Sequence, residues 1–265
     1  MPSAVEAILT QDRRVVTAAL AAVTLSAWAY TLAMHGMGMG PAGGEAGEGS
    51  MSPLMVMQAA WSLSYAAAML MMWWVMMAAM MLPSAAPLIL LFAAVQRKQR
   101  EANNPFVPTG ALVGGYLAVW AAFSIVATCL QWGLDQSALL TMSLSVASRA
   151  LGATLLIAAG LYQFTPVKGA CLRHCRSPLA FVAAHWRSGS RGAFRMGLTH
   201  GVFCLGCCWV LMGLLFFGGV MNLVWIGGLA LYVLVEKVMP RGHWVRYVSG
   251  GLLAGWGLAI AGGLL

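Results

Sequence analysis

The chain consists mainly of long apolar runs that are separated by short clusters of basic residues. A helix needs about 20 apolar residues to cross the hydrocarbon core of a bilayer, and several of these runs reach that length. Of the 265 residues, 61% are hydrophobic and 8% are charged, whereas soluble domains carry about 25% charged residues. We therefore predict an all-α, polytopic membrane helical bundle, because an apolar segment inside a bilayer satisfies its own backbone groups only as a helix.

The basic clusters predict how the helices are oriented, because cytoplasmic loops carry an excess of Lys and Arg. Such clusters lie at residues 13–14, 96–100, 168–195 and 237–246. We expect one integral membrane domain over residues 1–265 in a bacterial inner membrane, with the N-terminus cytoplasmic and the C-terminus external. The clusters account for the net charge of +8, so no nucleic-acid partner is expected. About seven transmembrane helices are expected, at residues 15–34, 54–95, 107–132, 149–164, 196–217, 221–238 and 247–265.

Two loops are expected to differ in character. Residues 35–53 are rich in Gly and Met and form the external loop, where His35, Met37 and Met39 serve either as weak metal capture or as part of a flexible linker. Residues 165–195 contain several basic residues and no acidic one, and form the largest cytoplasmic loop. In the sixth run, Glu236 and Lys237 read as a pair at the membrane interface.

The second apolar run is too long for one simple crossing. Residues 54–95 would span about 60 Å as a continuous helix, which is twice the hydrocarbon thickness. Pro83 and Pro87 should interrupt it, so that either its first part lies in the outer interface or the helix is broken within the membrane. The alternative, a proline kink satisfied by neighbouring helices, is slightly favoured.

The segment from His200 to Trp209, HGVFCLGCCW, carries the strongest chemical signal. On a helix, His200, Cys204, Cys207 and Cys208 lie at i, i+4, i+7 and i+8, which is one continuous face. A lone Cys in such a helix is usually a packing residue, but three within five positions and in line with a histidine predict a buried site for a soft metal or for thiol chemistry.

Further soft ligands occur in two other places. One is the basic loop, which contains Cys171, His174 and Cys175, and the other is a methionine-rich stretch that includes Met80 and Met81. The methionines are more typical of core filling than of ligation, since Met packs well into irregular gaps. Cys129 is isolated and receives no role. The candidate metal ligands are His200, Cys204, Cys207, Cys208, Cys171, His174, Cys175, Met80 and Met81.

The predicted compartment favours metal binding over disulfides. The Cys-bearing segments lie on the cytoplasmic side, where thiols are kept reduced. Thiolates and thioethers favour Cu(I), which is satisfied by two or three of them. Zn(II) is possible if both Cys/His groups combine into a tetrahedral site.

Three motifs follow one another in the order that marks a known family. They are W-x5-MMLPSAAP from Trp74, YQFTP-x4-C-x2-HC from Tyr162, and G-x2-C-x-GCCW-x2-M from Gly201. Over about Trp61 to Leu265 the chain resembles a bacterial family of integral membrane proteins described as predicted metal-binding, some of which are labelled copper chaperones. The resemblance implies a membrane protein that handles a metal.

We therefore expect a protein that binds Cu(I) for chaperone, assembly or transport purposes, and we do not expect an enzyme. Its partners would be the bilayer, the metal ion and a protein that delivers or receives the metal. The alternative is a membrane thiol-disulfide oxidoreductase that uses the C-x-x-C pair Cys204 and Cys207. A second alternative is a non-catalytic membrane scaffold with packing cysteines.

Overall fold

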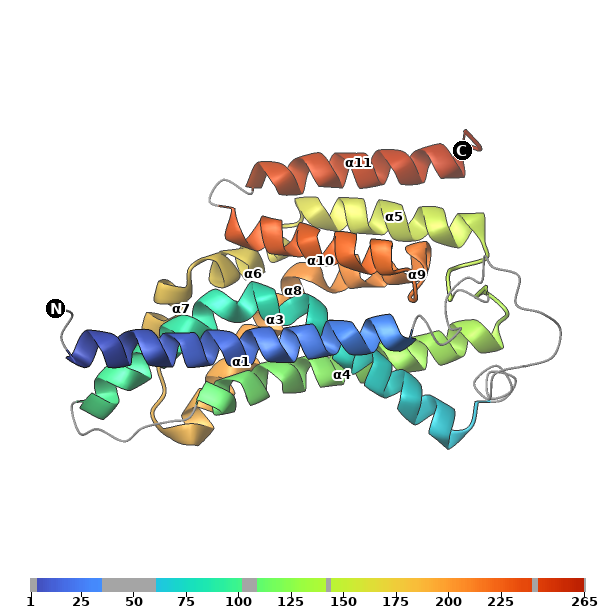
Figure 1. Ribbon diagram of the computed structural model, residues 1–265. Helices are drawn as coiled ribbons and strands as arrows, with labels where there is room; N and C mark the ends of the chain where they lie inside the picture. Colours follow the sequence, from blue (N-terminus) through green and yellow to red (C-terminus); the bar gives the residue numbers. More distant parts are fainter. Residues whose placement is uncertain (1–3, 35–60, 102–108, 142–143, 240–242, 265) are drawn as a thin grey trace.

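The computed structural model describes residues 4–34, 61–101, 109–141, 144–239 and 243–264, and its regular elements are helices (Figure 1). The all-α prediction is therefore confirmed. The helices are α1 (Ala4–Met34), α3 (Leu63–Glu101), α4 (Thr109–Gln136), α5 (Arg149–Phe164), α6 (Pro166–Arg176), α7 (Pro178–His185), α8 (Gly189–Gly213), α9 (Leu215–Gly218), α10 (Leu223–Val238) and α11 (His243–Ala261).

Several helices are long and apolar enough to cross a membrane. Four segments qualify by themselves, and α5 with α6 makes a fifth if this pair, bent by 66°, is one span. The helices α10 and α11, with 16 and 19 residues, occupy the last two predicted spans but are not among the four. The chain is thus a multi-pass membrane protein, while seven spans remain a prediction. The four segments are Val15–Ala33, Leu63–Gln99, Thr109–Gln136 and Gly189–Gly218.

The helices pack lengthwise, with α8 and α10 between two outer groups. The pair α5 and α11 lies on one side, and α1, α3 and α4 lie on the other (Figure 1). Helix α8 packs against α4, α6 and α10, and α10 also contacts α3. Side chains from α3, α4, α6, α8 and α10 therefore meet in the interior.

Glycines set the distance between α4 and α8. A Cβ on Gly115 would lie 2.1 Å from the carbonyl oxygen of Phe194, and a Cβ on Gly197 would lie 2.0 Å from that of Leu112. Only hydrogen atoms fit there, so the two backbones touch, as is typical of small residues between membrane helices. This contact fixes the register of α8, and hence of its cysteines, against α4.

The sequence left open whether the second apolar run is interrupted and slightly favoured prolines accommodated by neighbouring helices. Helix α3 is continuous from Leu63 to Glu101 and contains both Pro83 and Pro87, so an interruption within the described part is wrong. Neighbouring groups bind the backbone beside the prolines: the Tyr116 hydroxyl donates to the Met81 carbonyl oxygen at 3.0 Å, and the Ser84 hydroxyl does so at 2.8 Å. A proline lacks the N–H that would bind the carbonyl one turn earlier, so these bonds steady the segment and do not replace the lost ones. Residues 54–60 and the expected external loop 35–53 lie outside the described residues.

The expected loop at 165–195 is largely helical, which corrects the sequence-based interpretation. The Thr165 hydroxyl caps α6 by accepting from the Lys168 backbone N–H at 3.3 Å, and Pro166 begins the helix. Pro178 begins α7 in the same way. Proline suits the first helical turn because its missing N–H has no partner there anyway. The basic residues predicted a cytoplasmic loop here, and the two short helices α6 and α7 were not predicted from the sequence.

Candidate metal centre

Helix α8 presents the predicted ligands on one buried face. Cys204, Cys207 and Cys208 are 0% exposed and His200 is 4% exposed, so the helical spacing predicted from the sequence holds. The apolar surroundings are supplied by the buried methionines of α3 and by α4. The three thiols therefore lie in the interior of the bundle.

A fourth thiol comes from α6. The Cys175 thiol lies close to those of Cys204 and Cys207, and Cys208 lies close to the same two cysteines. We call Cys175, Cys204, Cys207 and Cys208 the thiol cluster. Cys175 is partly exposed, unlike the three cysteines of α8. The sequence placed Cys175 within reach of α8, and the structure brings the two segments together.

A lysine ammonium group lies directly against the cluster. Lys237 of α10 donates from Nζ to Cys204 Sγ at 2.9 Å and to the Ser84 hydroxyl at 3.1 Å. The Tyr116 hydroxyl lies 3.1 Å from the same Cys204 sulfur. A cation beside a thiol favours the thiolate, which is the form that binds metals and acts as a nucleophile. The cluster thus combines soft donors with one positive charge.

The thiols do not yet converge on one point. Cys207 and Cys208 both donate from Sγ to the Cys204 carbonyl oxygen at 3.0 Å. Within the described residues, no three side chains of the His, Cys, Asp or Glu types form a ready-made metal site. The donor set suits a soft ion, but the thiols would have to lose these protons and turn toward the ion before they could bind it.

The remaining predicted Cys and His ligands lie beside the cluster with other contacts. A Cβ on Gly206 of α8 would meet the Cys171 sulfur at 2.8 Å, so Cys171 packs against the α8 backbone. The His174 ring stacks on Phe203 with centroids 4.0 Å apart, and its Nδ1 lies 3.0 Å from the Ala170 carbonyl oxygen. These contacts hold both side chains against α8 and α6.

His200 is buried next to the cluster without a hydrogen bond at one ring nitrogen. Its ring stacks against Tyr116, with centroids 5.8 Å apart, and meets Phe181 edge-on. Its Nδ1 is buried and has no partner among the described residues. A buried polar nitrogen of this kind is costly to leave unsatisfied.

The predicted methionine ligands are core residues. Met80 and Met81 are 1% and 0% exposed and belong to the main hydrophobic core. The polar group that Met81 offers near the cluster is its backbone carbonyl, which accepts from Tyr116. This arrangement agrees with core filling, which the sequence favoured for the methionines.

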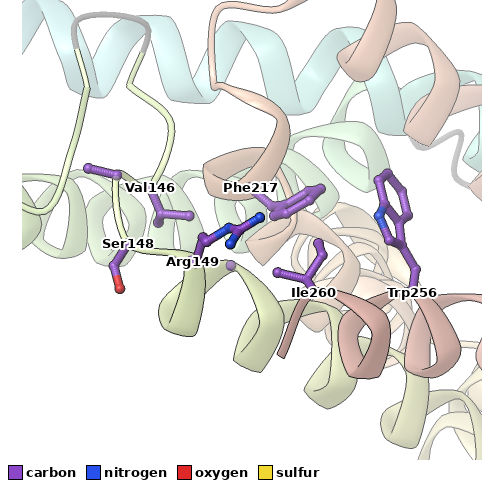
Figure 2. A pocket seen from close by; sticks show the side chains of 8 residues that line it. Val146, Ser148, Arg149, Phe217, Trp256 and Ile260 are labelled. Atoms are coloured by element: carbon purple, nitrogen blue, oxygen red, sulfur yellow. The ribbon is translucent and has the colours of Figure 1, made fainter. Parts of the chain in front are cut away.

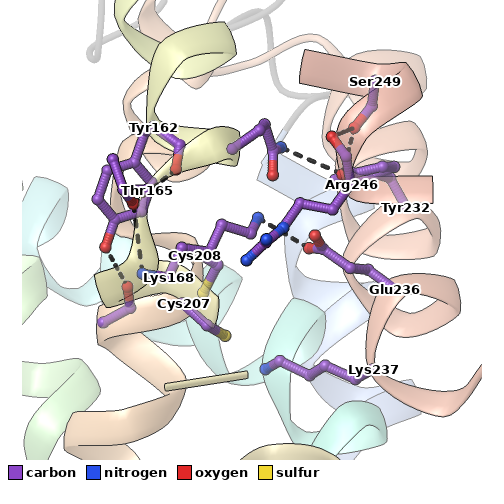
Figure 3. A network of polar contacts seen from close by, with 12 residues as sticks. Tyr162, Thr165, Lys168, Cys207, Cys208, Tyr232, Glu236, Lys237, Arg246 and Ser249 are labelled. Carbon is purple, nitrogen blue, oxygen red and sulfur yellow. Dashed lines mark hydrogen bonds and ion pairs between the residues drawn. The ribbon is translucent and has the colours of Figure 1, made fainter. Parts of the chain in front are cut away.

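The sequence-based pairing of Glu236 with Lys237 is wrong. Glu236 forms an ion pair with Lys168 of α6 at 2.9 Å, with side chains 1% and 0% exposed (Figure 3). Consecutive residues of a helix point about 100° apart and do not face each other. Lys237 therefore lies on a different side of α10 and reaches the cysteines. Lys237, Tyr116 and Ser84 were missed, and only the rarity of a lysine in an apolar run signalled the first of them.

A polar network lies beside the buried ion pair. The Gln163 amide donates to the Tyr232 hydroxyl at 3.1 Å, and Tyr232 lies 2.7 Å from the Ser249 hydroxyl (Figure 3). The Arg176 guanidinium donates to the Glu236 carbonyl oxygen at 2.9 Å. The network joins α5, α6, α10 and α11, and Cys207 and Cys208 lie next to Lys168 (Figure 3).

A separate pocket lies at the ends of α5 and α11. It has a volume of about 360 Å³ and contains Arg149 and Ser148 beside Phe217, Trp256 and Ile260 (Figure 2). No Cys, His or Met lines it. This pocket offers no soft donor and is distinct from the thiol cluster.

Residues 70–260 match the model of a family described as copper chaperone, PpoB2. This range covers more than half of the chain and includes every residue of the thiol cluster, so the chain belongs to the copper chaperone family. No curated protein and no solved structure matches the chain.

Proposed function

We propose that this member of the copper chaperone family binds Cu(I) at the thiol cluster and holds or passes it within the membrane. The observation that carries the proposal is that four cysteines from α6 and α8 lie near one another in the core, one of them in contact with a lysine. Packing alone does not require four cysteines and a lysine in one region. Soft thiolates in an apolar, water-poor site are the donors that Cu(I) prefers.

The donor set favours copper over zinc. Two or three thiolates suffice for Cu(I), whereas structural Zn(II) usually takes four ligands in a closed tetrahedron. Here Lys237 and Tyr116 already contact Cys204, which limits the room around its sulfur. His200, with its free Nδ1, is an additional donor near the cysteines.

Cys175 is the natural exchange ligand of the cluster. The three cysteines of α8 are fully buried, so a partner protein has no direct access to them, whereas Cys175 is partly exposed. Metal transfer between thiol sites proceeds through shared coordination, so the least buried residue of the cluster is the first that a partner would reach. A metal-delivering or metal-receiving protein would therefore dock at the α6 side.

We further propose seven spans with a cytoplasmic N-terminus in a bacterial inner membrane, as the basic clusters indicate. The test uses two exposed serines, Ser188 before α8 and Ser137 after α4. In a Cys129→Ser background, Ser188→Cys should label only from the cytoplasmic side and Ser137→Cys only from the external side. Labelling with the sides exchanged, or of both from one side, would contradict this orientation.

The metal proposal is tested by anaerobic purification and measurement of bound copper. The wild type should bind Cu(I) through sulfur, as X-ray absorption would show, and Cys204→Ser or Cys207→Ser should abolish tight binding. Cys129→Ser is the matched control, because Cys129 is an exposed cysteine outside the cluster. Its copper content should equal that of the wild type.

Other outcomes would overturn the proposal. A metal-free wild type whose Cys204 and Cys207 oxidise reversibly as a pair would favour a thiol-disulfide oxidoreductase. A metal-free protein with inert thiols would leave a scaffold.

A further inference from the structure

We infer that Lys237 makes the thiol cluster selective for monovalent over divalent metal ions. The inference rests on the proposed function and adds to it a residue that sets specificity. Its basis is the contact between the Lys237 ammonium group and the Cys204 sulfur in the interior of the bundle.

Lys237 lacks a carboxylate partner of its own. Its side chain is 5% exposed, and its nearest polar contacts are Cys204 and Ser84. The neighbouring Glu236 carboxylate is engaged with Lys168, and no described carboxylate lies within ion-pair distance of Lys237. A buried charge needs a compensating charge because the interior screens poorly. A thiolate at Cys204, the sulfur that the ammonium group contacts, is therefore the anion available to balance this lysine.

The net charge of the site then differs between a bound monovalent ion and a bound divalent ion. Two thiolates together with one Cu(I) carry one negative charge, which Lys237 neutralises. The same two thiolates with a divalent ion are already neutral, so that Lys237 leaves one uncompensated positive charge in the core. Unpaired buried charge is strongly unfavourable, so the lysine disfavours the divalent ion.

The position of Lys237 acts in the same direction as its charge. A divalent ion on the same two thiolates would need further, uncharged ligands to complete a four-coordinate site, and Lys237 and Tyr116 already occupy one side of Cys204. A monovalent ion with two thiolates leaves that side of Cys204 free for the ammonium hydrogen bond. Both effects disappear if the ammonium group is removed.

The test compares Ag(I), as a redox-inert monovalent probe, with Cd(II). The purified full-length protein is equilibrated with both ions, and bound metal is measured by mass spectrometry, with thiolate absorption as a check on sulfur ligation. Lys237→Met should lower the ratio of bound Ag(I) to Cd(II) at least about tenfold. Lys237→Arg, which keeps the charge, should retain most of the preference. Lys98→Met is the matched control, because Lys98 is exposed at the end of α3.

The two proposals fail in different ways. If the wild type binds neither ion, the proposed function is wrong. If the wild type binds Ag(I) at the cysteines and Lys237→Met keeps the same ratio, the lysine inference is wrong and the proposed function stands. Because the ratio is measured within one folded sample, a loss of protein yield in Lys237→Met does not change it, and equal melting temperatures of the Met and Arg variants would confirm comparable folding.

Discussion

Two buried polar regions contact neighbouring positions of α10 and handle charge differently. In the first, Lys168 and Glu236 form an ion pair beside hydroxyl and amide groups. In the second, the Lys237 ammonium group contacts the Cys204 sulfur, and no described carboxylate lies within ion-pair distance of it. The comparison separates a region whose lysine has a carboxylate partner from a region whose lysine contacts a thiol. The first stabilises the fold, and we propose that the second is available to a ligand.

The largest expected effect on stability comes from breaking the ion pair between Lys168 and Glu236. Glu236→Ala leaves the Lys168 ammonium buried without a partner, and we expect it to lower the free energy of unfolding by about 3–5 kcal/mol. Thermal unfolding in detergent measures the loss. The double variant Lys168→Met/Glu236→Met removes both charges and should recover most of the stability. If the double variant is as unstable as Glu236→Ala, the region is not a compensated pair.

The stability of the protein should also depend on metal binding at the thiol cluster. Because an ion that binds only the folded protein stabilises it, Ag(I) at 100 times its dissociation constant should raise the stability of the wild type by about 2.7 kcal/mol. Cys204→Ser should remain folded without Ag(I) and should gain no stabilisation from it. An equal shift of the melting temperature in both proteins would place the ion elsewhere.

The close contact between α4 and α8 should also contribute to stability, because it sets the distance between the two helices. In Gly197→Ala the new methyl group would overlap the Leu112 carbonyl, and the forced separation of the helices should cost about 1–3 kcal/mol. Gly133→Ala is the matched control on α4, since nothing lies within 4 Å of a Cβ there. A neutral Gly197→Ala would show that the helices are not held by this contact.

The smallest effect is expected at the hydroxyl that touches the cluster. Tyr116→Phe removes the hydrogen bond to the Met81 carbonyl and the contact with Cys204, which should cost about 1 kcal/mol. Ag(I) binding should persist in this variant, because the thiols and Lys237 remain. Complete loss of binding would make Tyr116 a required member of the site.

The sequence was sufficient for features that depend on local pattern. Apolar runs predicted helices, and the spacing from His200 to Cys208 predicted one buried face, since both follow from the helical period. How neighbouring helices are rotated and shifted against each other could not be predicted from the local pattern. That Lys237 reaches Cys204 depends on how α10 is rotated against α8, and this rotation follows from side-chain packing across 33 positions of sequence.

Two features depend on surroundings that the sequence does not display. The prolines left open whether α3 is interrupted, and the helix is continuous through both of them. Adjacent opposite charges predicted a Glu236–Lys237 pair, but the helix directs the two side chains to different neighbours. The partners of Glu236 and Lys237 come from distant parts of the chain, which is why this pairing was wrong.

The adjacency of Glu236 and Lys237 on one rigid helix has a kinetic consequence. A displacement of α10 that withdraws the ammonium group from the thiols also strains the Glu236 contact with Lys168. Spontaneous opening by this route is therefore slow, because two buried contacts must break together. If the thiol cluster holds an ion as we propose, the same coupling gives that ion a long residence time.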